Sequence, residues 1–189
     1  MIEIIFFGRG GQGAVTAAQI LATAAFREGK VAQAFPSFGP ERRGAPVTAY
    51  ARINDRRIVD RTQIMEADYI LVLDPNVLKT AMPLSAVKEK GCAVLNVDWS
   101  EEKVRTEAEV KGIEIFGIDA SAISEEVYGK RPIPITNITM LGAFAAVSGE
   151  VQLDTILVAV NNFFSGAQAE AAKKCARMAF EKIKGAKVS

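Results

Sequence analysis

The chain of 189 residues contains no histidine, and this absence restricts its chemistry more than any other feature of its composition. Without imidazole there is no His-assisted triad, no His-ligated metal and no side chain whose ordinary pKa lies near neutrality. The two cysteines, Cys92 and Cys175, are too few to ligate an iron–sulfur cluster or a structural zinc ion. These absences favour a binding subunit over a complete enzyme.

Strong charge and long hydrophobic runs are also missing. The net charge is only +1, so no overall field attracts nucleic acid or a membrane surface. No apolar run reaches membrane-spanning length, and Met1–Phe7 does not resemble a signal peptide. We therefore expect a cytoplasmic protein with buried thiols that contacts neither nucleic acid nor membrane. The chain shows no repeat, linker or low-complexity segment, which predicts a single domain over residues 1–189.

Short apolar runs alternate with helical patterns along the first two thirds of the chain. This order predicts an α/β three-layer sandwich with a mainly parallel sheet. Asp74 and Asp98 each follow an apolar run and mark the carboxyl ends of two strands. The expected strands are Ile2–Phe7, Val31–Phe35, Tyr69–Leu73, Ala93–Val97 and Ile113–Ile118. The expected helices are Gln12–Glu28, Asp60–Glu66, Asn76–Lys90 and Ser121–Tyr128.

Two further segments complete the predicted fold. Pro46–Ile53 alternates with period two and turns at Asn54-Asp55 into Arg56–Val59, which predicts an added β-hairpin. The last third is helical, with helices expected over Thr136–Ser148, Leu153–Phe164 and Ala167–Lys184. Met140–Val147 is apolar on every face, so it is either internal core or a surface that a partner subunit covers.

A glycine-rich loop, Gly8-Arg9-Gly10-Gly11-Gln12-Gly13, lies between the first strand and the first helix. In this geometry backbone N–H groups and the positive end of a helix dipole face an anion. Glycines allow the backbone to approach that anion closely and to adopt positive φ. The loop predicts a ligand that carries phosphate, and its alternative is a tight strand-to-helix turn with no ligand.

Two familiar phosphate sites fit the loop incompletely. The spacing of Gly8, Gly10 and Gly13 matches the dinucleotide fingerprint, but no acid follows at the end of the second strand. A P-loop requires Lys and Ser or Thr after the last glycine, where this chain has Ala14 and Val15.

A second loop, Ser37-Phe38-Gly39-Pro40-Glu41-Arg42-Arg43-Gly44-Ala45-Pro46, follows the second strand. Its place predicts that it lies at the carboxyl edge of the sheet beside the glycine loop, where open α/β sheets bind ligands. Arg42 and Arg43 suit bidentate contacts to phosphate, although a solvated arginine pair is the plainer interpretation.

The glycine loop, the run from Gln33 to Val47, and Asn137 ahead of Met140-Leu141-Gly142-Ala143 together resemble the gamma subunit of 2-oxoacid:ferredoxin oxidoreductases. The pyruvate and branched-chain enzymes are the most similar, and the resemblance spans essentially the whole chain. One departure is Phe7, where many members have histidine.

The resemblance implies that this chain is a subunit of an enzyme that oxidatively decarboxylates a 2-oxoacid to acyl-CoA. It implies coenzyme A binding at this chain through Gly8, Arg9, Gly10, Gly11, Gln12, Gly13, Ser37, Gly39, Glu41, Arg42, Arg43 and Gly44. Thiamine diphosphate, Mg and iron–sulfur clusters are implied on partner subunits, with ferredoxin as an indirect partner. The sequence agrees, because no Gly-Asp-Gly precedes Asn161-Asn162 as the thiamine motif would require.

Two alternatives of other kinds stay open. An NADP-dependent reductase would place the pyrophosphate on Gly8–Gly13 and the 2′-phosphate on Arg42 or Arg43, but the chain has no Tyr-x-x-x-Lys pair. A docking subunit that binds no nucleotide would use the same loops for assembly alone.

Overall fold

The computed structural model describes residues 1–37, 46–80, 83–97 and 112–183. Its centre is a six-stranded sheet in the order β2-β3-β1-β4-β5-β6. Strands β1, β4, β5 and β6 run parallel, and β3 is antiparallel to both β1 and β2. The strands are β1 Ile2–Arg9, β2 Val31–Pro36, β3 Pro46–Asn54, β4 Ala67–Val72, β5 Val87–Asn96 and β6 Glu114–Ile118.

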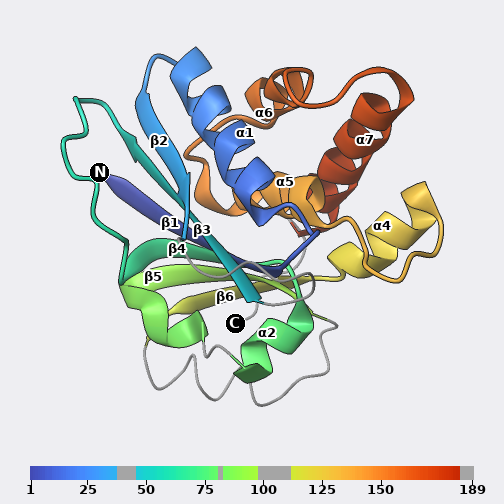
Figure 1. Cartoon of the computed structure of the whole chain (residues 1–189), viewed down its shortest axis with the longest axis horizontal. Coiled ribbons are helices and arrows are strands. Elements are labelled where there is room, and N and C mark those ends of the chain that lie inside the picture. The colour runs from blue at the N-terminus through green and yellow to red at the C-terminus, as the bar shows by residue number, and fades with distance from the viewer. Residues whose placement is uncertain (38–45, 81–82, 98–111, 184–189) are drawn as a thin grey trace.

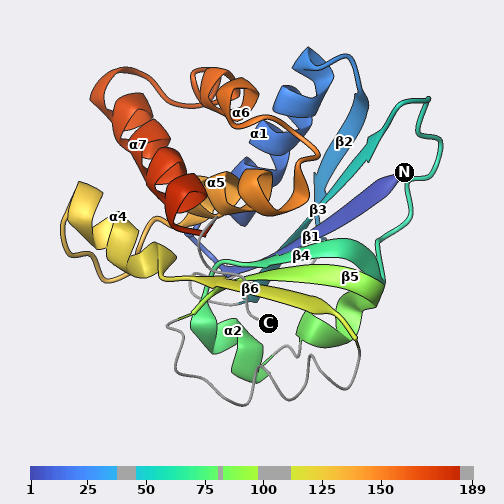
Figure 2. The same ribbon diagram turned by 180° about the vertical axis from the view of Figure 1, so that it is seen from behind.

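Helices cover both faces of this sheet unequally. The described helices are α1 Ala14–Arg27, α2 Pro75–Thr80, the 3₁₀ turn η1 Pro83–Ala86, α4 Ala120–Tyr128, α5 Asn137–Ser148, α6 Leu153–Val160 and α7 Gly166–Ile183. Helices α1 and α4 to α7 lie on one face, and α2 lies on the other (Figures 1 and 2). The predicted α/β sandwich with a helical C-terminal third is confirmed.

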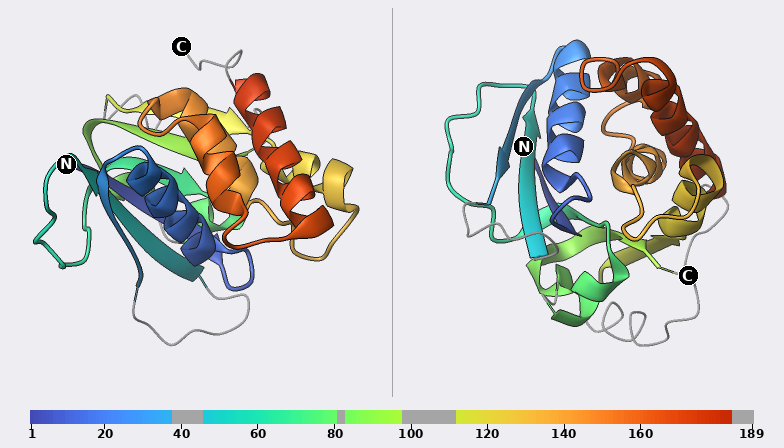
Figure 3. Two further views of the ribbon diagram at one scale, coloured as in Figure 1. Left: turned by 90° about the horizontal axis from the view of Figure 1, so that it is seen from above. Right: turned by 45° about the vertical axis from the view of Figure 1, so that its right-hand side comes forward.

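Burial on both faces explains why the parallel strands are nearly continuous apolar runs. In β1, Ile4 and Phe6 pack into the larger helical layer, whereas Ile5 packs into the layer of α2. Helix α5 is enclosed by α1, α4, α6 and α7 (Figure 3), and its residues from Asn137 to Ala145 are buried. Its all-round apolar character therefore serves the internal core.

Only the first strand of the predicted hairpin exists, and its partners differ from the prediction. Strand β3 pairs with β2 on one side and β1 on the other, while Arg56–Val59 forms no strand. The predicted helix Asp60–Glu66 is also wrong. Tertiary contacts replace both elements, because buried Ile58 and Ile64 anchor the segment and the carboxylate of Asp60 lies 3.7 Å from the buried guanidinium of Arg52.

Two other boundaries differ for physical reasons. The predicted helix Asn76–Lys90 ends at Thr80, η1 begins at Pro83, and Val87 starts β5 opposite Ala67. The β-branched Val87 gains a ladder partner in place of a helical turn. Strand β2 is not a buried parallel strand but an edge strand, half-buried and antiparallel to β3.

Candidate functional site

The glycine loop crosses from the end of β1 to the start of α1 at the carboxyl edge of the parallel strands. The N–H of Gln12 donates to the carbonyl of Arg9 at 3.0 Å, which closes a β-turn. Gly11 has φ +94° at the third position of this turn, and Gly13 has φ +81° directly before α1. Both conformations favour glycine, so the local backbone explains two of the loop glycines without a ligand.

The N-terminus of α1 has no side-chain cap. Gly13 is the N-cap residue and supplies no side-chain cap, and the first turn contains no acidic residue. The leading N–H groups of a helix have no partner inside it, and Val15 and Thr16 of this first turn are only partly buried. The loop therefore presents backbone donors and a helix dipole to any anion that approaches this edge.

Arg9 and Gln12 of the loop converge on Asp74, which follows β4. Arg9 Nε and Gln12 Nε2 each donate to Asp74 Oδ2 at 2.6 Å. Gln12 Oε1 accepts the backbone N–H of Arg9 at 2.7 Å. The N–H and the Nδ2 amide of Asn76 donate to Asp74 Oδ1 at 2.9 and 3.0 Å. One buried carboxylate thus ties the loop to the end of the neighbouring strand.

Asp74 is ionised at neutral pH. Burial alone would raise the pKa of its carboxyl group, but hydrogen bonds from Asn76, Arg9 and Gln12 outweigh burial and hold this pKa below its usual range. The negative charge is matched by Arg9, so the loop keeps no net positive side chain of its own. From the glycine loop itself, attraction of an anion would come from backbone donors and from the remaining nitrogens of Arg9.

Asn137, at the start of α5, brings a second helix N-terminus to the loop. Its Nδ2 donates to the carbonyl of Gly13 at 3.5 Å, and its Oδ1 accepts the N–H of Ile138 at 3.0 Å. Thr136 precedes α5 without capping it, because its hydroxyl donates to the carbonyl of Leu73 at 3.1 Å. Two helices that lack side-chain N-caps therefore meet at one edge.

The second loop begins and ends at the same edge of the sheet as the first. The N–H of Ser37 donates to the carbonyl of Thr48 at 2.8 Å, and Pro46 is paired opposite Arg9. Pro46 is therefore the direct neighbour of the glycine loop, whereas Ser37 is at the same edge of the sheet but bonded to β3. The predicted site residues Gly39, Glu41, Arg42, Arg43 and Gly44 lie outside the described residues.

Sequence reasoning missed the polar residues that assemble this edge from other strands and helices. The sequence did indicate the position of Asp74, because an acid directly after a buried strand lies at the carboxyl end of that strand. Asn96 gave none: its Nδ2 donates to the carbonyl of Leu73 at 2.8 Å and to Ser121 Oγ at 3.0 Å. These bonds fix the end of β4 and so the position of Asp74.

The cysteines of this chain do not fit an iron–sulfur cluster. Cys92 is buried in β5 and Cys175 in α7, and the chain has no other cysteine. In the part of the chain that the structure describes, no group of His, Cys, Asp and Glu side chains could hold a metal ion. None of the helices within that part is long and apolar enough to span a membrane.

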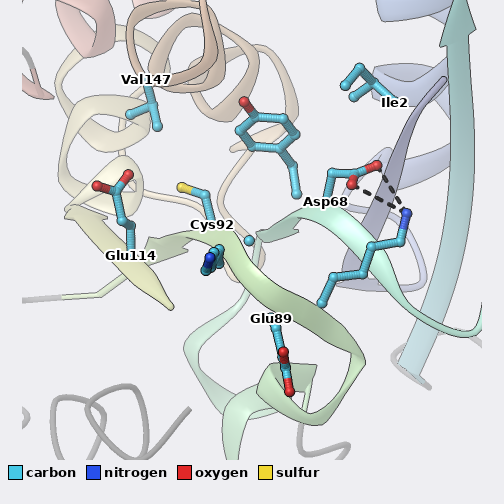
Figure 4. A pocket seen from close by; sticks show the side chains of 10 residues that line it. Ile2, Asp68, Glu89, Cys92, Glu114 and Val147 are labelled. Atoms are coloured by element: carbon cyan, nitrogen blue, oxygen red, sulfur yellow. Dashed lines mark hydrogen bonds and ion pairs between the residues drawn. The ribbon is translucent and has the colours of Figure 1, made fainter. Parts of the chain in front are cut away.

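A pocket of about 310 Å³ lies at the opposite, amino edge of the sheet (Figure 4). Tyr69, Cys92 and Glu114 line it, together with the ion pair of Lys88 and Asp68 at 3.2 Å. Burial raises the pKa of the Cys92 thiol to about 12, so this thiol stays protonated and is no nucleophile. The lining of this pocket carries both positive and negative side chains, so it does not favour a phosphate group.

Comparison with known proteins identifies the family. The family of pyruvate ferredoxin/flavodoxin oxidoreductases matches residues 3–182 of the chain. The chain belongs to this family. It is 49% identical over 182 residues to the pyruvate/ketoisovalerate oxidoreductases common subunit gamma of Thermococcus kodakarensis, covering 96% of this chain and 97% of that protein.

Other members agree over similar lengths. Pyruvate synthase subunit PorC of Methanocaldococcus jannaschii is 45% identical, with 97% of each chain covered. The crystal structure of pyruvate oxidoreductase subunit PORC from Thermotoga maritima superposes with a TM-score of 0.77 at 32% identity, covering 95% of each chain. The chain therefore matches oxidoreductase subunits of this family nearly end to end.

The NADP reductase alternative gains no support from this family or from the fold. In a dinucleotide fold the second strand lies beside the first and offers its end to the ribose. Here β3 lies between β1 and β2 in the sheet, so the strand that follows α1 is not the neighbour of β1.

Proposed function

We propose that this chain is the gamma subunit of a pyruvate/ketoisovalerate-type 2-oxoacid:ferredoxin oxidoreductase and contributes coenzyme A binding at the carboxyl edge of its sheet. The whole enzyme would convert a 2-oxoacid and coenzyme A to acyl-CoA and carbon dioxide, with electrons passing to ferredoxin. The names of the end-to-end relatives support the subunit assignment.

The convergence of the glycine loop with the N-termini of α1 and α5 is the observation that carries the ligand proposal. Coenzyme A is a polyanion whose pyrophosphate and further phosphate require clustered donors. The loop offers backbone N–H groups at a helix N-terminus that has no side-chain cap, which is a standard way to bind phosphate. Ser37 and Pro46 bring the ends of an arginine-containing segment to the same edge.

Redox chemistry is assigned to partner subunits in this proposal. Two buried cysteines cannot hold a cluster, and the chain has no histidine for acid–base catalysis. The gamma chain would bind and orient coenzyme A, while thiamine diphosphate, magnesium and the clusters lie on other chains. Docking to those chains is the second part of its role.

Titration of the assembled oxidoreductase with coenzyme A tests the ligand role. Arg42→Ala and Arg43→Ala should each remove a charge-assisted contact of about 1.5–3 kcal/mol and raise the coenzyme A requirement. Gly10→Ala should hinder the approach of the loop backbone to the ligand. Salt should weaken binding in the wild type, because partly exposed contacts between arginine and phosphate are screened.

Two comparisons keep the result interpretable. Arg57→Ala removes an exposed arginine near the amino edge and should leave the coenzyme A requirement unchanged. Reduction of the clusters by 2-oxoacid alone, before coenzyme A enters, should survive in the loop variants. Unchanged coenzyme A dependence in all of the loop variants would mean that the loops serve assembly and do not bind the ligand.

A further inference from the structure

We infer that Asp74 is the positioning residue of the anion site, because it holds Arg9 through Nε and leaves the terminal guanidinium nitrogens for a phosphate group. This inference rests on the proposed function and assigns a role that no loop motif indicates. Asp74 would act through Arg9 and the loop backbone, without touching the ligand itself.

The carboxylate of Asp74 is held on both oxygens. Oδ2 accepts from Arg9 and Gln12, and Oδ1 accepts twice from Asn76. The Asp74 side chain is only 3% exposed, whereas that of Arg9 is 31% exposed. A buried, fully bonded acid therefore anchors a cation that still reaches solvent.

Arg9 keeps most of its donors after this ion pair forms. A guanidinium carries five N–H groups, and the bond to Asp74 uses the one on Nε. Within the described residues, the hydrogen bonds and ion pair of the Arg9 side chain all go through Nε to Asp74. The terminal nitrogens form the fork that matches phosphate oxygens, so the ion pair orients Arg9 without saturating it.

Gln12 extends the same control to the loop backbone. Its amide joins Asp74 Oδ2 to the N–H of Arg9, at 2.6 and 2.7 Å. One carboxylate thus sets both the backbone and the side chain of Arg9. An amide at position 74 cannot replace it, because its NH₂ group would face two donors whichever way it turned.

The negative charge of Asp74 would repel a phosphate if it were unmatched. Four donors surround it, including the Arg9 cation, so its field is largely cancelled locally. Loss of positioning should therefore outweigh the removal of repulsion when the charge is deleted. Deleting the charge of Asp74 should therefore weaken the binding of coenzyme A.

Steady-state kinetics of the assembled oxidoreductase, with Asp74→Asn, Arg9→Ala and the double variant, tests the inference. Each single change should raise the KM for coenzyme A about tenfold or more, the usual size for a lost hydrogen bond to a charged group. The effects of the two changes should be less than multiplicative in the double variant, because both disturb the contact of the same guanidinium. The kcat at saturating coenzyme A should change less than about twofold, since positioning affects binding.

Asp68→Asn is the matched control. Asp68 lies near the start of β4, at the edge of the sheet opposite to Asp74, and forms its own ion pair with Lys88 at 3.2 Å. Its loss should leave the KM for coenzyme A unchanged. If Asp74→Asn fails to assemble, Asp74→Glu keeps the carboxylate and should give a KM between the wild type and Arg9→Ala. A Glu variant with a KM at or above that of Arg9→Ala would contradict the inference.

The outcomes separate this inference from the proposed function. If Arg9→Ala raises the KM but Asp74→Asn does not, the positioning role is wrong and coenzyme A binding stands. If the effects of the two changes multiply in the double variant, Asp74 acts independently of Arg9 and the inference also fails. If neither change alters the KM, both the inference and the ligand role of this loop are wrong.

Discussion

Gly13 is the residue where loop conformation and side-chain packing restrict the sequence together. A Cβ atom there would lie 2.5 Å from Nδ2 of Asn137, and the backbone has φ +81°. Gly11 has a similar φ of +94° but open space around it. A comparison of substitutions at Gly11 and Gly13 therefore separates the cost of backbone strain from the cost of steric overlap.

We expect Gly11→Ala to lower the free energy of unfolding by about 1–2 kcal/mol, the cost of a left-handed conformation for a residue with a Cβ. Gly13→Ala should cost about 1–3 kcal/mol more, because Asn137 must also move. Urea unfolding of both variants measures this difference. Adding Asn137→Ala should recover part of the extra loss, and equal losses for Gly11→Ala and Gly13→Ala would contradict the packing argument.

The ion pair of Asp74 predicts a pH dependence of stability. Because the pKa of Asp74 is lowered in the folded chain, its ionised form stabilises the fold above the ordinary carboxyl pKa. That contribution should fade as the pH drops from about 4 toward the lowered pKa. Asp74→Asn lacks it, so the stability difference from the wild type should be largest near neutrality and shrink in acid. A difference that is independent of pH would exclude this origin.

At the scale of elements, the backbones of α5 and α7 approach each other closely at Gly142. A Cβ at Gly142 would overlap the backbone carbonyl of Ala176. Gly142 is therefore explained by helix packing, since its helix is buried from Asn137 to Ala145. The motif Met140-Leu141-Gly142-Ala143 belongs to the core and not to the ligand edge.

Replacing Gly142 with Ala should lower the free energy of unfolding by about 3 kcal/mol, at the upper end for overpacking. Helix propensity alone would make the Ala variant more stable by about 1 kcal/mol. A lower free energy of unfolding would therefore report the close packing. Gly149→Ala is the comparison, because Gly149 has φ +64° and open space. It should cost about 1–2 kcal/mol through backbone strain alone. Thermal unfolding ranks the two, and a stabilised Gly142→Ala would refute the close contact.

At the scale of the whole molecule, the chain builds a hydrophobic core on each face of its sheet. Helix α5 is covered by the chain's own helices. The isolated chain should therefore fold cooperatively and show no visible absorbance and no 2-oxoacid-dependent reduction of viologen dye. Circular dichroism and an activity assay on the purified chain check both statements. Turnover by this chain alone would overturn the assignment of chemistry to partner subunits.

The sequence by itself determined the elements whose information is local. Continuous apolar runs predicted the parallel strands, and the glycine spacing predicted the loop between β1 and α1. These features follow from side-chain period, backbone freedom and composition, which neighbouring residues set together. The Ser37 end of the second loop was also placed correctly, because a strand end fixes the edge of the sheet.

Only the tertiary structure decided which distant residues meet. It inserted β3 between β1 and β2, replaced the helix predicted at Asp60–Glu66 with a segment held by Arg52, and turned Val87–Lys90 into strand. It also brought Asp74 to Arg9 and Asn137 to Gly13, residues 65 and 124 positions apart. Such contacts depend on strand order and helix packing, which sum weak preferences over the whole chain. For that reason the sequence predicted the loop, but it did not predict that the carboxylate of Asp74 and the amide of Asn137 hold the loop in place.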